Sequence, residues 1–342
     1  MVWSTQTGCD SDESRFEPSP VFESEFTVSE RRVPVMGDGL PPMLVEMLGR
    51  EIEVMAWDDG PQSDALKRAV AFITYGHPRV DGPLMDRAPH LKVVSNHGVG
   101  VDHIDCDAAR ERGIAVGNTP GCLDASTADM TLALMLAVAR NVVIGDTFAR
   151  SAQFTHYDPS TLIGFEVTGS TLGIVGLGRI GREVARRARA FDMRIVYHNR
   201  RRDEAAEREL GVTYRSLPEL LAESDFVTLN CPLTSETTNL IGAKEFALMK
   251  PTGILINVAR GPVVNHDALL AALKSRRIAA AALDVTAPEP LPRDHPLLEL
   301  NNLVITPHLG SASNRTRRRM MEMTVENLRA ALNDAPLPWR VV

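Results

Sequence analysis

The sequence predicts an α/β protein built from two doubly wound parallel-sheet domains. Two observations carry this prediction. Short apolar runs alternate with helical segments from residue 32 onward, and a second, longer alternation of the same kind begins at Thr171. Strands that alternate with helices form parallel layers. A chain of 342 residues is long enough for two such domains, each with its own core.

Five apolar runs in the first half are expected to form strands. Pro34 stands inside the first run and lacks a backbone donor, which predicts an edge strand. Residues 1–30 precede this pattern; they are acidic, rich in serine and without apolar periodicity, so a mobile tail is expected there. The predicted strands are residues 33–36, 52–55, 70–73, 92–95 and 114–116.

The second half repeats the alternation of apolar runs and helical segments, with six apolar runs, which is the pattern of a nucleotide-binding sheet. In such sheets the ligand groups lie at the carboxyl ends of the strands. A final helix, about residues 313–332, has no strand of its own to cover, so we expect it to return to the first domain. The predicted strands are residues 171–175, 194–197, 225–229, 253–257, 278–283 and 303–306.

A glycine-rich turn joins the first of these strands to a helical pattern. Gly176 permits a tight turn, Gly178 lets a pyrophosphate approach the backbone, and Gly181 allows the helix to pack closely on the strand. The amides at the start of that helix then face the phosphates. A structural glycine turn is the alternative, but the preceding strand and following helix favour a dinucleotide site.

The end of the next strand indicates the form of the cofactor. A site for NAD usually ends this strand with an acid that binds the ribose hydroxyls and repels a 2′-phosphate. Here Asn199 carries no negative charge, and Arg200 and Arg201 can pair with a phosphate. NADP(H) is therefore the expected cofactor, with NAD(H) as the alternative. The competing interpretation is a solvated basic turn neutralised by Asp203 and Glu204.

Three later strand ends carry an arginine, a carboxylate and an imidazole: Arg260, Glu289 and His308. A hydride that reaches a carbonyl leaves developing negative charge on oxygen, which needs a proton and a fixed positive partner. Each residue has a simpler interpretation, as a loop closure, a cap or a solvated acid. All three simpler interpretations would have to hold together, so we predict a reaction centre.

The composition excludes several classes of protein. A net charge of −7 argues against nucleic acid as a main partner, because such binding needs concentrated lysine and arginine. Four scattered cysteines without a CxxC pair indicate neither disulfides nor a zinc site, and no other metal-ligand spacing occurs. The longest apolar stretch, residues 130–139, is far shorter than the roughly 20 residues that cross a bilayer. With no secretory or transit signal at the start, we expect a cytoplasmic protein without a membrane or metal partner.

From about residue 91 to residue 310 the chain resembles the D-isomer-specific 2-hydroxyacid dehydrogenases, in particular their glyoxylate/hydroxypyruvate reductase branch. The resemblance implies a flavodoxin-like substrate domain (residues 31–126 and 312–342), a Rossmann cofactor domain (residues 127–311) and a cleft between them. The segments that carry it are residues 98–105, the turn at Gly176, residues 232–237, 257–261, 283–285 and 306–308.

The resemblance also implies roles for single residues. Arg260 would bind the substrate's carboxylate and keto oxygen, His308 would donate the proton, and Glu289 would hold the imidazole in its charged form. Backbone N–H groups near Val99 and Gly100 would receive the carboxylate, and Asp284 would hold the nicotinamide carboxamide. Arg260 and His308 would also touch the cofactor, and its other expected contacts are Arg179, Ile180, Cys231, Pro232, Thr237, Val258, Ala259 and Gly310.

The pocket wall and the assembly follow the same resemblance. His77 and His97, at the ends of first-domain strands, are candidates for the cleft wall. The family usually dimerises through the segment that corresponds to residues 121–154, so we expect a homodimer with the apolar helix 130–139 buried between subunits. Phe154 and Tyr157 stand where an aromatic, often tryptophan, is common, which leaves substrate size open.

The function expected on these grounds is the NADPH-dependent, D-specific reduction of small 2-oxo acids, glyoxylate and hydroxypyruvate first. A reductase of a longer sugar acid such as 2-ketogluconate is an alternative. A second alternative is a scaffold of the transcriptional corepressor type that senses NAD(H); Asn199 and Arg200 count against it.

Overall fold

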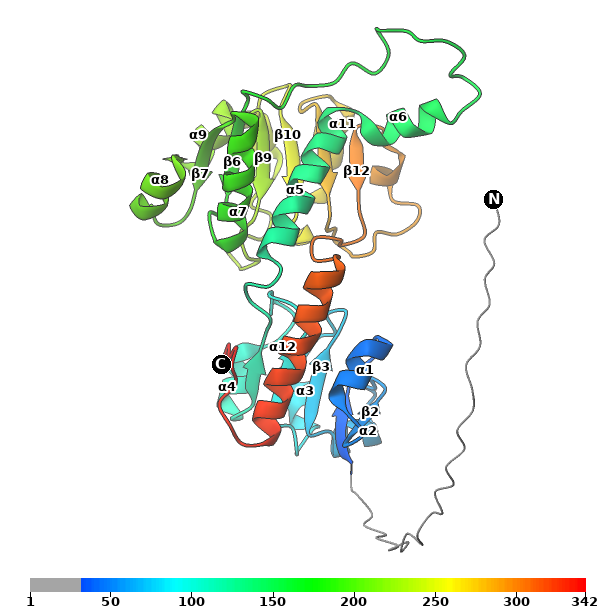
Figure 1. Ribbon diagram of the computed structural model, residues 1–342, viewed down its shortest axis with the longest axis vertical. Coiled ribbons are helices and arrows are strands. Elements are labelled where there is room, and N and C mark those ends of the chain that lie inside the picture. The colour runs from blue at the N-terminus through cyan, green and yellow to red at the C-terminus, as the bar shows by residue number, and fades with distance from the viewer. Residues whose placement is uncertain (1–31) are drawn as a thin grey trace, which may run out of the picture.

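The computed structural model describes residues 32–342 and contains two parallel sheets, each flanked by helices (Figure 1). This confirms the predicted fold class of two parallel-sheet α/β units. The predicted mobile tail, residues 1–30, lies outside the described residues. The smaller sheet has the order β2-β1-β3-β4-β5. Its strands are β1 (Val33–Met36), β2 (Ile52–Met55), β3 (Ala71–Thr74), β4 (Val93–Asn96) and β5 (Ala115–Gly117).

Pro34 lies in an interior strand, so the prediction of an edge strand is wrong. β1 is flanked by β2 on one side and β3 on the other. The pairing of β1 with β3 begins only at Val35, opposite Ala71, and the carbonyl of Pro34 accepts from the N–H of Val70 at 2.9 Å. The missing N–H of Pro34 therefore falls before the ladder starts, and no ladder hydrogen bond is lost.

The larger sheet has the order β12-β11-β10-β9-β6-β7-β8. All of its strands except β8 were predicted to within a few residues. β8 consists of two residues at the sheet edge, too short to show a periodicity in the sequence. The strands are β6 (Thr171–Val175), β7 (Arg194–His198), β8 (Thr213–Tyr214), β9 (Phe226–Leu229), β10 (Ile254–Asn257), β11 (Ala280–Leu283) and β12 (Leu303–Ile305).

Helices connect the strands of both sheets, as parallel pairing requires. Those associated with the smaller sheet are α1 (Pro42–Leu48), α2 (Asp64–Arg68), α3 (Gly82–Asp86), α4 (Cys106–Glu111) and α12 (Asn314–Leu332). Those that follow β5 and accompany the larger sheet are α5 (Asp124–Ala139), α6 (Val142–Ala149), α7 (Arg179–Ala188), α8 (Glu204–Leu210), α9 (Leu217–Glu223), α10 (Ala243–Leu248) and α11 (His266–Lys274), with short 3-10 turns η1 (Arg189–Phe191), η2 (Gly261–Val263) and η3 (Pro296–Glu299).

The final helix, α12, returns to the smaller sheet, as the sequence predicts (Figure 1). Leu328, which is fully buried, belongs to the same apolar cluster as Val35 and Val93 of that sheet. The side chain of Asn327 donates to the carbonyl of Asn118 and accepts from the N–H of Trp339. The chain therefore passes between the two sheets twice, before α5 and before α12.

Helix α5 packs inside its own chain, so the expectation that the helix at residues 130–139 is buried between subunits is wrong. Leu132, Leu134 and Met135 are buried in the core that Ile174 and Ile256 of the larger sheet also line. Apolar exposure lies further along: Val142 and Val143 on α6 are about half exposed, and α6 has no buried residue. In Figure 1, α6 and the segment after it project away from both sheets.

Within residues 32–342 no single helix has the length and apolar character of a membrane span; α5 and α6 meet those criteria only as a pair, bent by 58°.

Candidate active site

A cleft of about 1240 Å³ lies between the two sheets, at the carboxyl ends of their strands. The smaller sheet contributes the loops that follow β3 and β4, with His77 and residues 98–102. The larger sheet contributes the loops that follow β9 to β12, with Arg260, Glu289 and His308. Loops at this edge of a doubly wound sheet are where ligands bind.

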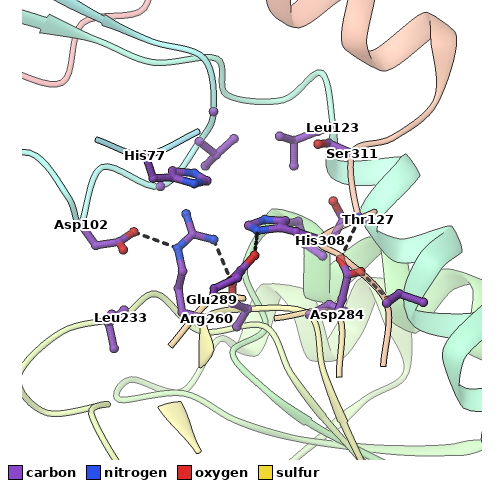
Figure 2. A pocket seen from close by; sticks show the side chains of 18 of the residues that line it. His77, Asp102, Leu123, Thr127, Leu233, Arg260, Asp284, Glu289, His308 and Ser311 are labelled. Atoms are coloured by element: carbon purple, nitrogen blue, oxygen red, sulfur yellow. Dashed lines mark hydrogen bonds and ion pairs between the residues drawn. The ribbon is translucent and has the colours of Figure 1, made fainter. Parts of the chain in front are cut away.

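Arg260, Glu289 and His308 come together in the cleft (Figure 2). Nδ1 of His308 lies 2.7 Å from Oε1 of Glu289. Burial acts to raise the pKa of the Glu289 carboxyl, but the hydrogen bond and the charge of His308 outweigh it, so this pKa lies below its usual value. An ionised carboxylate can only accept, so Nδ1 donates, and the other ring nitrogen of His308 is left free for a ligand.

Arg260 is held on three sides. The side-chain amide of Asn257 closes the turn beneath it, through the N–H of Ala259 and the carbonyl of Arg260. Nη1 of Arg260 donates to the carbonyl of Ala259, and Nε donates to Oδ1 of Asp102 at 2.9 Å. A Cβ on Gly100 would collide with Nη2, so this nitrogen lies against the loop after β4.

Asp102 received no role from the sequence, although it lies in the segment 98–105 that carries the resemblance. Burial acts to raise the pKa of its carboxyl, and the charge and hydrogen bond of Arg260 outweigh burial and lower it. An acid two residues after a Gly-x-Gly turn was the available signal. Its partner lies 158 positions further along the chain, so only the fold reveals the pair.

Asp284 holds the loop that carries His308. Its two carboxylate oxygens accept from the hydroxyl of Thr306 and from the N–H groups of Leu309 and Gly310, at 2.6 to 2.7 Å. Its carbonyl accepts from the N–H of His308 at 2.9 Å. His308 has a φ of 57°, a left-handed conformation that is uncommon for a non-glycine residue. These contacts on both sides keep the imidazole turned into the cleft.

The glycine turn after β6 has the shape that a dinucleotide needs. Gly176 has a φ of 99°, and a Cβ there would lie 2.6 Å from the N–H nitrogen of Cys231. A Cβ on Gly178 would meet nothing within 4 Å, so this backbone is open to a ligand, and a Cβ on Gly181 would collide with the carbonyl of Gly176. The three positions thus serve turn, ligand approach and helix packing, and a pyrophosphate would rest on Gly178 and the start of α7.

Asp203 and Glu204 do not neutralise the basic turn after β7. Asp203 pairs with Arg182 at 2.5 Å, Glu204 lies 3.9 Å from Arg208, and Glu207 takes Arg202 through two hydrogen bonds. Arg200 and Arg201 are exposed and form no ion pair within 4 Å among residues 32–342, although the charge of Arg200 acts on Glu236 and helps to lower the pKa of that carboxyl. Oδ1 of Asn199 accepts from the N–H of Leu177 at 2.7 Å, which ties this turn to the glycine turn.

The other expected residues divide into two groups. Thr237 does not line the cleft; its hydroxyl braces the loop after β9 through the carbonyl of Pro232 and the N–H of Thr234. Burial raises the pKa of the Cys231 thiol to about 11. No group of side chains among residues 32–342 is arranged to hold a metal. The predicted residues that do line the cleft, besides Arg260, Glu289 and His308, are Val99, Gly100, Arg179, Ile180, Cys231, Pro232, Val258, Ala259, Asp284 and Gly310.

Both candidate histidines of the first half, His77 and His97, line the cleft. His103, which the sequence did not single out, packs edge-on against His77. Burial lowers the pKa of all three imidazoles to about 4. Nearby positive charge lowers each pKa further: Arg260 and His308 act on His77, Arg317 acts on His97, and His77 acts on His103. These three imidazoles are therefore uncharged at neutral pH.

The chain is similar to proteins of one family along most of its length. The family model for the NAD-binding domain of D-isomer-specific 2-hydroxyacid dehydrogenases matches residues 132–310. A glyoxylate reductase from Pyrococcus furiosus is 45% identical over 299 residues, which is 84% of this chain and 89% of that protein. The crystal structure of a Thermus thermophilus protein aligns with a TM-score of 0.82 and 47% identity, over 90% of this chain and 99% of that one. The crystal structure of an NADPH-dependent glyoxylate/hydroxypyruvate reductase from Sinorhizobium meliloti, in complex with NADP and malonate, aligns with a TM-score of 0.83 and 32% identity. The alignment covers 91% of this chain and 97% of that one.

The doubly wound sheet with its glycine turn, and the reactive side chains gathered at its strand ends, define an oxidoreductase that uses a nicotinamide cofactor. The chain belongs to the D-isomer-specific 2-hydroxyacid dehydrogenase family. This confirms the resemblance seen in the sequence, and it favours an enzyme over the corepressor-type scaffold.

The uncharged histidines predict how stability depends on pH. An imidazole titrates near pH 6.5 in the unfolded chain and at about 4 in the folded one, so between these values the unfolded state binds more protons. Their contribution to stability is fully present above about pH 6.5 and is lost as the pH falls toward 4. Denaturant unfolding should therefore show the free energy of unfolding falling from pH 6.5 to pH 5.

The buried His97 and the exposed His156 provide the test of that prediction. His97→Gln should flatten the decline in the free energy of unfolding between pH 6.5 and 5, and His156→Gln should leave it unchanged. The same slope in the parent protein and the His97 variant would contradict the assignment.

Proposed function

We propose that this protein reduces small 2-oxo acids, glyoxylate and hydroxypyruvate first, to 2-hydroxy acids with NADPH, giving the D product where a stereocentre forms. The observation that carries the proposal is the pairing of His308 with Glu289 beside Arg260, in one cleft. The names of the similar proteins support the substrate class. The direct test is the loss of nicotinamide absorbance when glyoxylate and NADPH are added, and no turnover with any 2-oxo acid would contradict it.

The substrate carboxylate would be held from both halves of the cleft. Nη2 of Arg260 lies against Gly100, so one carboxylate can accept from the guanidinium and from backbone N–H groups of the loop after β4. Asp102 occupies Nε and so leaves Nη2 directed at the ligand. The planar fork of arginine suits the planar group that a 2-oxo acid presents.

The proton would come from His308. Its Nδ1 is engaged by Glu289, so the other ring nitrogen faces the cleft and can donate to the keto oxygen. A nicotinamide bound above the glycine turn would supply the hydride. Arg260 and the imidazolium would together stabilise the negative charge that develops on that oxygen.

The first kinetic prediction concerns Glu289. Ionised Glu289 and charged His308 stabilise each other, since His308 lowers the pKa of the Glu289 carboxyl. Glu289→Gln removes the charge and keeps the shape, so the falling limb of the kcat/KM profile should move to lower pH while NADPH affinity stays near normal. An unmoved pH profile in the Gln variant would contradict the proposed pairing.

Replacing the proposed proton donor tests its role directly. His308→Ala should lower turnover on the order of 10²- to 10⁴-fold.

The second kinetic prediction concerns NADPH over NADH. Arg200 forms no hydrogen bond or ion pair within 4 Å among residues 32–342 and interacts with Glu236 at longer range, so its guanidinium is available to a 2′-phosphate. Arg202 is instead held by Glu207. Arg200→Ala should raise KM for NADPH and leave KM for NADH unchanged, and the matched Arg202→Ala should not discriminate between them. Equal losses for both cofactors in Arg200→Ala would mean that this side chain serves the fold.

Assembly is a separate proposal: a second copy of the chain covers the apolar side chains of α6 and the segment after it. Phe154 is 50% exposed, Tyr157 81% and Ile163 77%. An apolar surface of this kind on a monomer is an association liability.

Sedimentation at micromolar concentration should give twice the chain mass. Ile163→Glu should lower this mass toward that of one chain, with a normal circular dichroism spectrum as the control for folding. A monomer for the unaltered protein would contradict the assembly.

A further inference from the structure

His77 faces the reaction centre from the opposite half of the cleft. It follows β3 in a left-handed conformation with a φ of 63°, directly after Gly76, which has a φ of 85°. Figure 2 shows its ring across from Arg260 and beside His308. The rings of His77 and His308 are nearly parallel, 17° apart, with centroids separated by 5.6 Å. A ligand held by Arg260 and His308 therefore lies next to this imidazole.

The ring of His77 packs against other imidazoles, and its nitrogens are free to bind a ligand. His103 meets it edge-on, with ring centroids 4.9 Å apart and planes at 80°. Both nitrogens of His103 are buried without a hydrogen-bond partner among the described residues, so His103 serves as packing beneath His77. The nitrogens of His77 form no hydrogen bond with residues 32–342, and Nε2 lies near Gly98 at the start of the carboxylate-binding loop.

The charge of His77 decides which chemical group it suits. Burial, together with Arg260 and His308, lowers the pKa of His77 to about 4, so the ring is neutral at working pH. A neutral imidazole offers one donor and one acceptor, which matches a hydroxyl group. A carboxylate already has better partners in this cleft, namely the guanidinium of Arg260 and the loop N–H groups.

The three groups on C2 of a 2-oxo acid lie in one plane. The carboxylate is assigned to Arg260 and the loop at residues 98–100, and the keto oxygen to His308. The guanidinium of Arg260 reaches both of these groups, so the third bond of C2 points away from Arg260, and the ring of His77 lies across from Arg260 (Figure 2). The remaining substituent, which begins at C3, then meets the ring of His77.

Building on the proposed function, we propose that His77 binds the hydroxyl on C3 of the substrate and thereby selects hydroxypyruvate over pyruvate. Glyoxylate has no C3 and does not use this contact. His77 thus determines substrate specificity from the first half of the chain, whereas the reacting groups of the same cleft belong to the second half.

The experiment compares kcat/KM for hydroxypyruvate, pyruvate and glyoxylate in the parent protein and in His77→Gly. Glycine adopts the left-handed conformation without strain, so the variant removes the ring and keeps the loop. Loss of one hydrogen bond should lower kcat/KM for hydroxypyruvate about three- to tenfold relative to glyoxylate. The preference for hydroxypyruvate over pyruvate should fall by the same factor.

Two further variants serve as a graded test and a control. His77→Asn keeps a donor and an acceptor on a residue that tolerates the left-handed region, so it should retain part of the preference. Asp192→Gly makes a similar backbone change at a φ of 53° in the loop before β7, outside the cleft, and should leave all three ratios unchanged.

The outcomes separate this inference from the proposed function. If His77→Gly lowers kcat/KM equally for all three acids, or for none, His77 does not bind the C3 hydroxyl and the inference is overturned. The parent protein's activity with glyoxylate tests the proposed function independently. No activity with any of the three acids would overturn the proposed function, and this inference with it.

Discussion

The ion pair between Asp102 and Arg260 spans the cleft and relates its two halves to each other. Both side chains are largely shielded, with 21% of Arg260 and 27% of Asp102 exposed, so solvent screens the pair less than it would at the surface. It aims the guanidinium and brings the loop after β4 against Nη2, at a glycine that tolerates no side chain. The contact thus sets Arg260 of one half against the proposed carboxylate-binding loop of the other.

Much of the fold could be predicted from local pattern. Five of the eleven predicted strands begin where the structure has them, because buried parallel strands read as short apolar runs. The errors have tertiary causes. Pro34 was predicted on an edge strand because it lacks a backbone donor. In the structure β3 pairs with β1 only from Val35 onward, so no donor is needed at Pro34, and the sequence of β1 does not reveal this. The helix at residues 130–139 was predicted at a subunit interface because it is apolar along its length. The sequence alone does not show that α7 and the larger sheet cover its apolar side chains.

The same distinction applies to the site. Arg260, Glu289 and His308 were predictable because parallel strands end at one edge, so residues at successive strand ends meet. Asp102 and His103 were not given roles, and His77 was a candidate for the cleft wall without a chemical role, because their importance depends on how closely the two sheets approach. The neighbouring acids of the 200–202 turn could not be assigned partners either, since Arg182 and Arg208 lie on helices whose facing sides only the fold defines.

Cys231 lies beside the glycine turn, where a more acidic thiol would be open to oxidants. With a pKa of about 11, only about one thiol in ten thousand is ionised at pH 7. The thiolate is the species that peroxides and alkylating agents attack. Burial therefore gives the cleft a sulfur atom that packs like a small apolar group and carries a thiol that is protonated at neutral pH.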